Sequence, residues 1–132
     1  MPKKYIYKTK IYYEDTDAGG VVYYANYFKF IERARTEMIY DILGLSHREL
    51  KEKHDCIFLV SNIAAKFLKP VKFENNIEVN TSIITKSAVR LKLLQIIKTN
   101  HELMFTCEVD LAVVNSRGQI AKLNNEILSK IY

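Results

Sequence analysis

YEDTDAGGVVYYANY, residues 13–27, joins a segment of strand character to one of helical character. It places two carboxylates, Asp15 and Asp17, two residues apart and follows them with Gly19 and Gly20. An aromatic and apolar run then opens a helix. A carboxylate beside the free amides of a helix N-terminus suits acyl-transfer chemistry, because the helix end can stabilise an oxyanion while the acid acts as base or nucleophile.

A long helix is predicted over residues 25–43, where apolar side chains recur at helical spacing. Gly44 is a good helix stop. The Ser46-His47-Arg48-Glu49 run has the spacing of a capping box, which predicts a second short helix ending at about Lys53. The opposite, polar face of the long helix is expected to carry Glu32, Arg33, Arg35 and Glu37.

The chain after residue 55 changes from helical to strand periodicity. Residues 56–68 are nearly all apolar, which is typical of a central strand buried on both faces. A short helix with Ile127, Leu128 and Ile131 on one face is predicted near the C-terminal end. Four more strands are predicted, at residues 5–13, 77–86, 89–98 and 103–115.

This order of elements, one strand, one long helix and four strands, predicts the α+β class. Short connections favour antiparallel pairing of the strands. One helix of roughly 18 residues can cover one face of a five-stranded sheet, and the other face then needs a partner. We therefore expect self-association through sheet or edge contacts.

Length and composition predict a single domain spanning residues 1–132. Hydrophobic residues make up 48% of the chain and charged residues 27%, which argues against disorder. No apolar run approaches the roughly 20 residues of a membrane span. No apolar region follows the basic residues at the N-terminus, so we expect no signal peptide. We therefore expect a cytoplasmic location.

The cysteines and histidines lack the spacing of a metal or redox site. Cys56 and Cys107 are expected to be free, buried thiols. His47, His54 and His101 are scattered, so neither a metal nor another cofactor is expected.

The formal net charge of +5 admits several explanations. A phosphate-bearing small molecule such as a nucleotide or coenzyme A would suit a basic chain, and so would nucleic acid. The lysines are dispersed and no basic-aromatic nucleic-acid module is present, so nucleic acid is not an expected partner. Solubility alone is also sufficient to explain the charge.

The neighbours of the two carboxylates favour a binding pocket. Asp-Thr-Asp before a helix is often turn and cap chemistry, and this is the expected role of Asp15. Val21, Val22, Tyr23 and Tyr24 form a wall that is unusually apolar for a loop. A carboxylate against this wall is expected to have a raised pKa and greater basicity.

The runs YYEDTDAGGVVYYANY at residues 12–27 and FIERARTE at residues 30–37 resemble the signature of the YbgC-type acyl-CoA thioesterases. These enzymes are a branch of the 4-hydroxybenzoyl-CoA thioesterase family. The resemblance implies the hotdog fold, in which a five-stranded antiparallel sheet wraps around one long helix. It also implies assembly into homodimers and often homotetramers.

The resemblance implies metal-free hydrolysis of acyl-CoA. Asp17 matches the carboxylate that attacks the thioester carbonyl or activates water, and the backbone amide near Tyr24 matches the group that polarises the carbonyl. Close YbgC-type relatives typically carry histidine where this chain has Tyr24, so assistance by an imidazole does not apply. Which of the two roles Asp17 takes stays open.

Other residues are candidates for contact with the substrate. Ser61 and Asn62 are a polar pair in an apolar strand and must find partners, either within the protein or on the substrate. The expected substrate-binding residues are Gly20, Val21, Val22, Tyr23, Tyr27, Ser61 and Asn62. The cations available for CoA phosphates are Lys66, Lys69, Lys72, Arg90 and Lys92.

Two other functions remain open. The chain could release acyl groups from acyl-carrier protein, since a basic surface would suit an acidic partner. It could also be a non-catalytic hotdog scaffold that binds an acyl thioester and is linked to phospholipid synthesis. Asp17 and the two glycines favour an enzyme over a scaffold.

Overall fold

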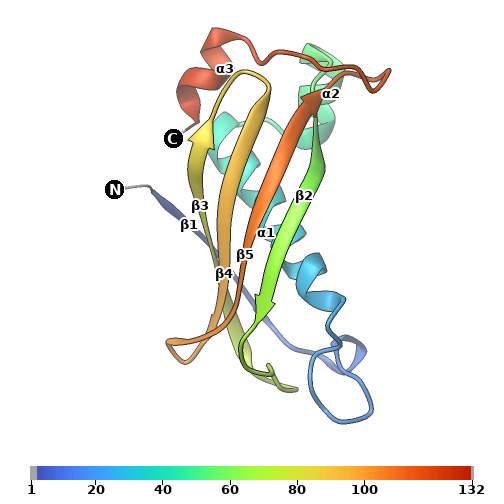
Figure 1. Ribbon diagram of the computed structural model, residues 1–132, viewed down its shortest axis with the longest axis vertical. Coiled ribbons are helices and arrows are strands. Elements are labelled where there is room, and N and C mark those ends of the chain that lie inside the picture. Colours follow the sequence, from blue (N-terminus) through green and yellow to red (C-terminus); the bar gives the residue numbers. More distant parts are fainter. Residues whose placement is uncertain (1–2, 132) are drawn as a thin grey trace.

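The computed structural model describes residues 3–131 and contains one five-stranded antiparallel sheet in the order β1-β3-β4-β5-β2. A long helix, α1, crosses one face of this sheet (Figure 1). This is the predicted α+β hotdog arrangement. Met1, Pro2 and Tyr132 of the predicted domain lie outside the described residues. The elements are β1 (Lys4–Lys10), a 3-10 turn (Tyr13–Asp15), α1 (Asn26–Leu43), α2 (His47–His54), β2 (Ile57–Phe67), β3 (Asn76–Lys86), β4 (Arg90–Thr99), β5 (Glu102–Val114) and α3 (Asn125–Lys130).

Helix α1 forms where the apolar periodicity predicted it, within one residue at its start. It ends at Gly44, whose φ of 66° lies in the left-handed region that glycine adopts without strain, and whose N–H donates to Tyr40 O. Its buried stripe includes Phe30, Ile31 and Met38, which pack against the sheet. The helix thereby supplies one half of the core and fixes the position of the residues that precede it.

The sheet explains the alternating sequence of β3 and β4. In β3, Ile77, Val79 and Ile83 are buried, as are Leu91 and Leu93 in β4. Strands β3, β4 and β5 follow one another as hairpins, and β1 pairs with β3. The first strand is shorter than predicted, because the chain leaves the sheet after Lys10 and enters the 3-10 turn.

The prediction of a central strand at residues 56–68 is wrong, because within residues 3–131 β2 lies at the edge of the sheet and pairs with β5 alone. Much of its apolar surface is exposed: Leu59 is 54% exposed, Val60 40% and Phe67 48%. A continuous apolar run is typical of a strand covered on both sides, but it does not say whether the cover belongs to the same chain.

Arg35 corrects a second prediction, because it is buried rather than on the polar face of α1. Its Nη1 donates to Gln95 Oε1 at 3.0 Å. Gln95 Nε2 in turn donates to Ile31 O and to Thr81 Oγ1. This network satisfies polar groups between α1 and the middle of the sheet.

The two short helices agree with the sequence patterns. The Ser46–Glu49 capping box is present at the start of α2, with Glu49 N donating to Ser46 Oγ. Helix α3 buries Ile127 and is capped by Asn124. Among the described residues, no helix combines the length and the apolar character needed to cross a bilayer.

Candidate active site

The loop between the 3-10 turn and α1 folds back on itself as a small hairpin. Asp17 N donates to Val21 O at 2.9 Å, and Gly20 N donates to Asp17 O at 3.1 Å. Thr16 and Val22 form an antiparallel bridge. Gly20 has a φ of 78°, which a residue with a side chain rarely adopts, so the turn requires glycine here.

This hairpin is anchored on the segment that connects β2 to β3. Val22 N donates to Val71 O at 2.8 Å, and Phe73 N donates to Gly20 O at 3.0 Å. The ring of Phe73 also stacks on Tyr13, with centroids 4.1 Å apart. A segment about 50 residues away in the sequence therefore fixes the conformation of the loop.

Asp17 lies at the turn of this hairpin with an exposed side chain. Its Oδ1 accepts a hydrogen bond from Gly19 N at 2.8 Å. A Cβ at position 19 would lie 3.3 Å from the same oxygen, so glycine keeps this approach open. The expected desolvation of Asp17 by Val21 and Val22 is wrong within a single chain, where Val22 instead joins the core.

Asp15 makes the structural contacts predicted for it. Only 3% exposed, it accepts a hydrogen bond from Tyr12 N on Oδ2 at 2.9 Å. Its Oδ1 lies 3.4 Å from Lys29 Nζ. The Asp15 carbonyl accepts from Tyr23 N and from Asn26 Nδ2, which ties the 3-10 turn to the start of α1.

The start of α1 presents free backbone amides. The helix begins at Asn26, and its N-cap, Ala25, supplies no side-chain hydrogen bond. Within residues 3–131, Tyr24 N and Ala25 N donate to no acceptor. These two amides lie at or directly before the N-cap, next to the positive end of the helix dipole. The N–H groups here can therefore stabilise an oxyanion.

An apolar groove of about 290 Å³ adjoins these amides. Tyr27 lines it, stacked on Phe105 with centroids 5.0 Å apart and edge-to-face with Phe67 at 5.2 Å. The residues that line the groove are Val22, Tyr24, Tyr27, Phe67, Leu68, Lys69 and Pro70. The loop and the end of β2 meet at the lower end of the molecule in Figure 1.

Two tyrosine hydroxyls in this region have raised pKa values. Burial raises the pKa of Tyr27, although its oxygen also accepts a hydrogen bond from Val71 N. A hydrogen bond with the side chain of Tyr24 raises the pKa of Tyr23. Both hydroxyls therefore stay protonated, and neither supplies a base near neutral pH.

The structure gathers the predicted substrate-binding residues of the loop but not those of β2. Gly20, Val21 and Tyr23 lie on the hairpin, and Val22 and Tyr27 line the groove. Ser61 lies at a β-bulge, where its Oγ donates to Asp110 O. It is six residues along β2 from Phe67, or roughly 20 Å, so one chain does not bring Ser61 and Asn62 to its own groove.

The predicted phosphate-binding cations are dispersed. Lys69 lines the groove and forms an ion pair of 2.7 Å with Glu102. Lys66 is exposed on β2. The backbone of Lys72 forms an isolated β-bridge with Val21 of the loop. Arg90 and Lys92 lie at the start of β4, at the far end of the strand from the β4–β5 turn. Lys69 is therefore the best placed of the five.

Sequence reasoning missed the second wall of the groove, formed by Phe67, Leu68 and Pro70. These residues were assigned to a buried strand and a turn. The sequence feature that could have indicated this wall is the Lys69-Pro70 pair, which ends a strand directly after two large apolar residues.

Comparisons with known proteins agree with the geometry. The thioesterase-like superfamily matches residues 12–131. The acyl-CoA thioesterase YbgC of Helicobacter pylori is 34% identical over 137 residues, covering 94% of this chain and 99% of that protein. A probable thioesterase from Bartonella henselae superposes with a TM-score of 0.87 at 28% identity, covering 92% of this chain and all of that chain. A 4-hydroxybenzoyl-CoA thioesterase has the same fold, with a TM-score of 0.90 at 11% identity over 98% of this chain and 99% of that one.

Proposed function

The chain belongs to the thioesterase-like superfamily and, within it, to the YbgC acyl-CoA thioesterases, and on this basis we propose that it hydrolyses acyl-CoA. One water molecule adds across the thioester bond, and the products are a carboxylic acid and free CoA. The observation that carries the proposal is that one loop holds both an accessible carboxylate, Asp17, and backbone amides without acceptors in the described chain, directly before α1.

The thioester carbonyl binds against Tyr24 N, which has no acceptor among the described residues. In the tetrahedral intermediate this oxygen carries a full negative charge, so the amide stabilises it more than the starting carbonyl. The side chain of Tyr24 has no acid–base role in this scheme.

Asp17 supplies the other half of the chemistry by one of two routes. As a nucleophile, its carboxylate attacks the carbonyl, expels the CoA thiolate and forms an anhydride that water then cleaves. As a general base, it removes a proton from water as that water attacks. A single turnover in isotope-labelled water tests the nucleophilic route, because label incorporated into Asp17 requires the anhydride.

The acyl group occupies the apolar groove, and Lys69 lies where it can meet the CoA part of the substrate. Tyr27 and Phe67 provide apolar surface against which the acyl chain loses its contact with water. The groove is open to solvent in the single chain, so a bound acyl chain needs a further cover.

We further propose that a second copy of the chain supplies this cover in a homodimer, which can pair again as a homotetramer. Support comes from the edge strand β2, where Leu59 and Val60 are 54% and 40% exposed. Ser61 and Asn62 lie on the same edge, where they can meet the partner's substrate. A sedimentation mass equal to one chain at micromolar concentration would contradict this part.

The direct test is a thiol-release assay with short, long and aromatic acyl-CoAs, run beside acyl-carrier protein loaded with the same acyl groups. The proposal expects faster release from at least one acyl-CoA than from the matched carrier-protein substrate. Faster release from the carrier protein favours the carrier-protein thioesterase. No release from any substrate favours a non-catalytic scaffold.

A further inference from the structure

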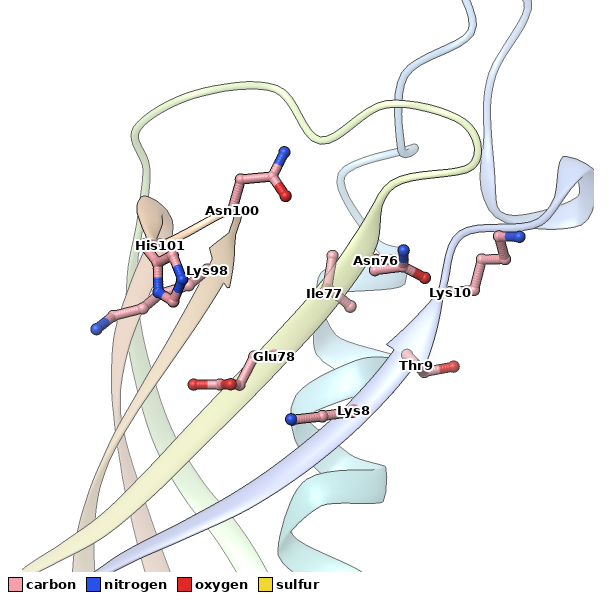
Figure 2. Close-up of a pocket in the computed structure, with 9 residues that line it drawn as sticks. All are labelled: Lys8, Thr9, Lys10, Asn76, Ile77, Glu78, Lys98, Asn100 and His101. Atoms are coloured by element: carbon pink, nitrogen blue, oxygen red, sulfur yellow. The ribbon is translucent and has the colours of Figure 1, made fainter.

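A second cavity, of about 530 Å³, lies over β1, β3 and β4 at the end of the sheet that carries the β4–β5 turn (Figure 2). Ile77 and Val79 of β3 face the core, so Glu78 between them faces away from α1. We call this cavity the basic groove and define it by Lys8, Lys10, Glu78, Lys98, Asn100 and His101.

The charges of the basic groove are unbalanced. Lys8 is the register partner of Glu78, and Glu78 is the register partner of Lys98, so these side chains form one row across three strands. Lys10 adds a third ammonium group on the same face of β1. Within the described part of the chain, none of the three ammonium groups makes a hydrogen bond or ion pair. Their donors are therefore free for an anion.

The β4–β5 turn brings two more polar side chains to this groove. Asn100 and His101 both have positive φ, 49° and 66°, and they connect the paired residues Thr99 and Glu102. A two-residue turn of this kind normally carries glycine at its second position. Here a histidine takes the strained position, and both side chains line the cavity (Figure 2). A residue kept in a strained conformation points to a use for its side chain.

The size and donors of the groove define its ligand. Its volume lies within the roughly 300–1,000 Å³ of small-molecule sites. Ammonium, amide and imidazole N–H groups match phosphate oxygens, and only one carboxylate opposes them.

We propose that the basic groove binds a phosphate-bearing small molecule of nucleotide size. Two sources share this chemistry: a free nucleotide, or the nucleotide end of CoA. The second source rests on the proposed acyl-CoA hydrolysis, whereas the first is independent of it.

The test is calorimetric titration with adenosine diphosphate, which needs no turnover. The probe is the double variant Lys8→Gln/Lys98→Gln, and the control is Lys51→Gln/Lys122→Gln, which removes two exposed lysines elsewhere. We expect the Kd to rise at least about tenfold in the groove variant and less than about twofold in the control. Absence of binding at about 10 mM ligand, or equal weakening in both variants, would overturn the proposal.

Two further arms sharpen the assignment. His101→Gly should keep or raise the Tm, because glycine suits the turn, and yet weaken binding of adenosine diphosphate. Unchanged affinity would overturn the role of His101.

In the other arm, a raised KM for acyl-CoA in Lys8→Gln/Lys98→Gln, at unchanged kcat, supports the nucleotide end of CoA. An unchanged KM combined with weaker binding of adenosine diphosphate supports a separate nucleotide site. If the wild-type protein hydrolyses acyl-CoA but binds no adenosine diphosphate, the groove is rejected and the proposed function stands.

Discussion

Replacing Tyr27 by phenylalanine removes one oxygen atom at the base of α1. That oxygen accepts a hydrogen bond from Val71 N at 3.2 Å, and both residues are buried, with 4% and 1% of their surfaces exposed. The ring remains and keeps its stacking on Phe105. The change therefore isolates one hydrogen bond, and it leaves the Val71 N–H buried without an acceptor.

The magnitude follows from the loss of that acceptor. A buried N–H left unsatisfied costs about 1–3 kcal/mol. With roughly 2.1 cal/mol/K of unfolding entropy per residue, a chain of 132 residues loses about 4 °C of Tm for each kcal/mol. We expect the Tm of Tyr27→Phe to fall by about 4–11 °C.

The assay is thermal unfolding by circular dichroism at one fixed protein concentration, together with the hydrolysis rate well below the Tm. Tyr40→Phe is the matched control, since Tyr40 lies on the same helix and is 53% exposed. Val71 O accepts a hydrogen bond from Val22 N of the candidate active-site loop, so the hydrolysis rate should fall as well. A Tm within about 1 °C of the wild type, or an equal loss in the control, would refute the reasoning.

Three further predictions concern the core and its edges. Cys107 is 2% exposed and burial raises its pKa to about 11, so iodoacetamide at about pH 8 should label it only after unfolding, as mass spectrometry would detect. Burial, and then the charge of Arg35, lower the pKa of His47 below its usual 6.5. The free energy of unfolding should therefore fall as the pH drops from 6.5 through the pKa of His47 in the folded state. Urea unfolding across this range should show a smaller fall in His47→Gln. Arg35→Met should lower the free energy of unfolding by about 1–3 kcal/mol, because Gln95 Oε1 loses its donor, whereas exposed Arg33→Met should change it by less than about 0.5 kcal/mol.

The helices and alternating strands were predictable from sequence because their signals are local. The apolar stripe of α1, its glycine stop and the capping box of α2 each involve residues within one or two turns. The alternation in β3 and β4 is equally local. Such patterns require no knowledge of the rest of the chain.

The position of β2 and the burial of Arg35 were not predictable in the same way. Strand order depends on which strands meet across the sheet, and β2 pairs with β5, about 50 residues later. Arg35 was assigned to the polar face because it is charged, but its partner Gln95 lies 60 residues away. No local sequence pattern near β2 or Arg35 predicts these long-range contacts.

Sequence patterns singled out the loop before the long helix as the candidate site, but they did not predict the environment of its carboxylates. The sequence predicted a turn or cap role for Asp15 and an apolar wall beside Asp17, whereas the structure buries Asp15 and leaves Asp17 exposed. The exposure of Asp17 was missed because the apolar residues after it turn into the core and the groove, guided by Val71. Residues of the second wall of the groove, such as Phe67, can be assigned to the site only when the fold is known.

The central claim is that Asp17 performs the chemistry of acyl-CoA hydrolysis, and Asp17→Asn tests it most directly. The control is Glu14→Gln, which removes an exposed acid three residues away. With an unchanged circular dichroism spectrum and Tm, kcat for the best acyl-CoA should fall by about 10²–10⁴-fold in Asp17→Asn and by less than about twofold in Glu14→Gln. An undiminished rate in folded Asp17→Asn would contradict the account.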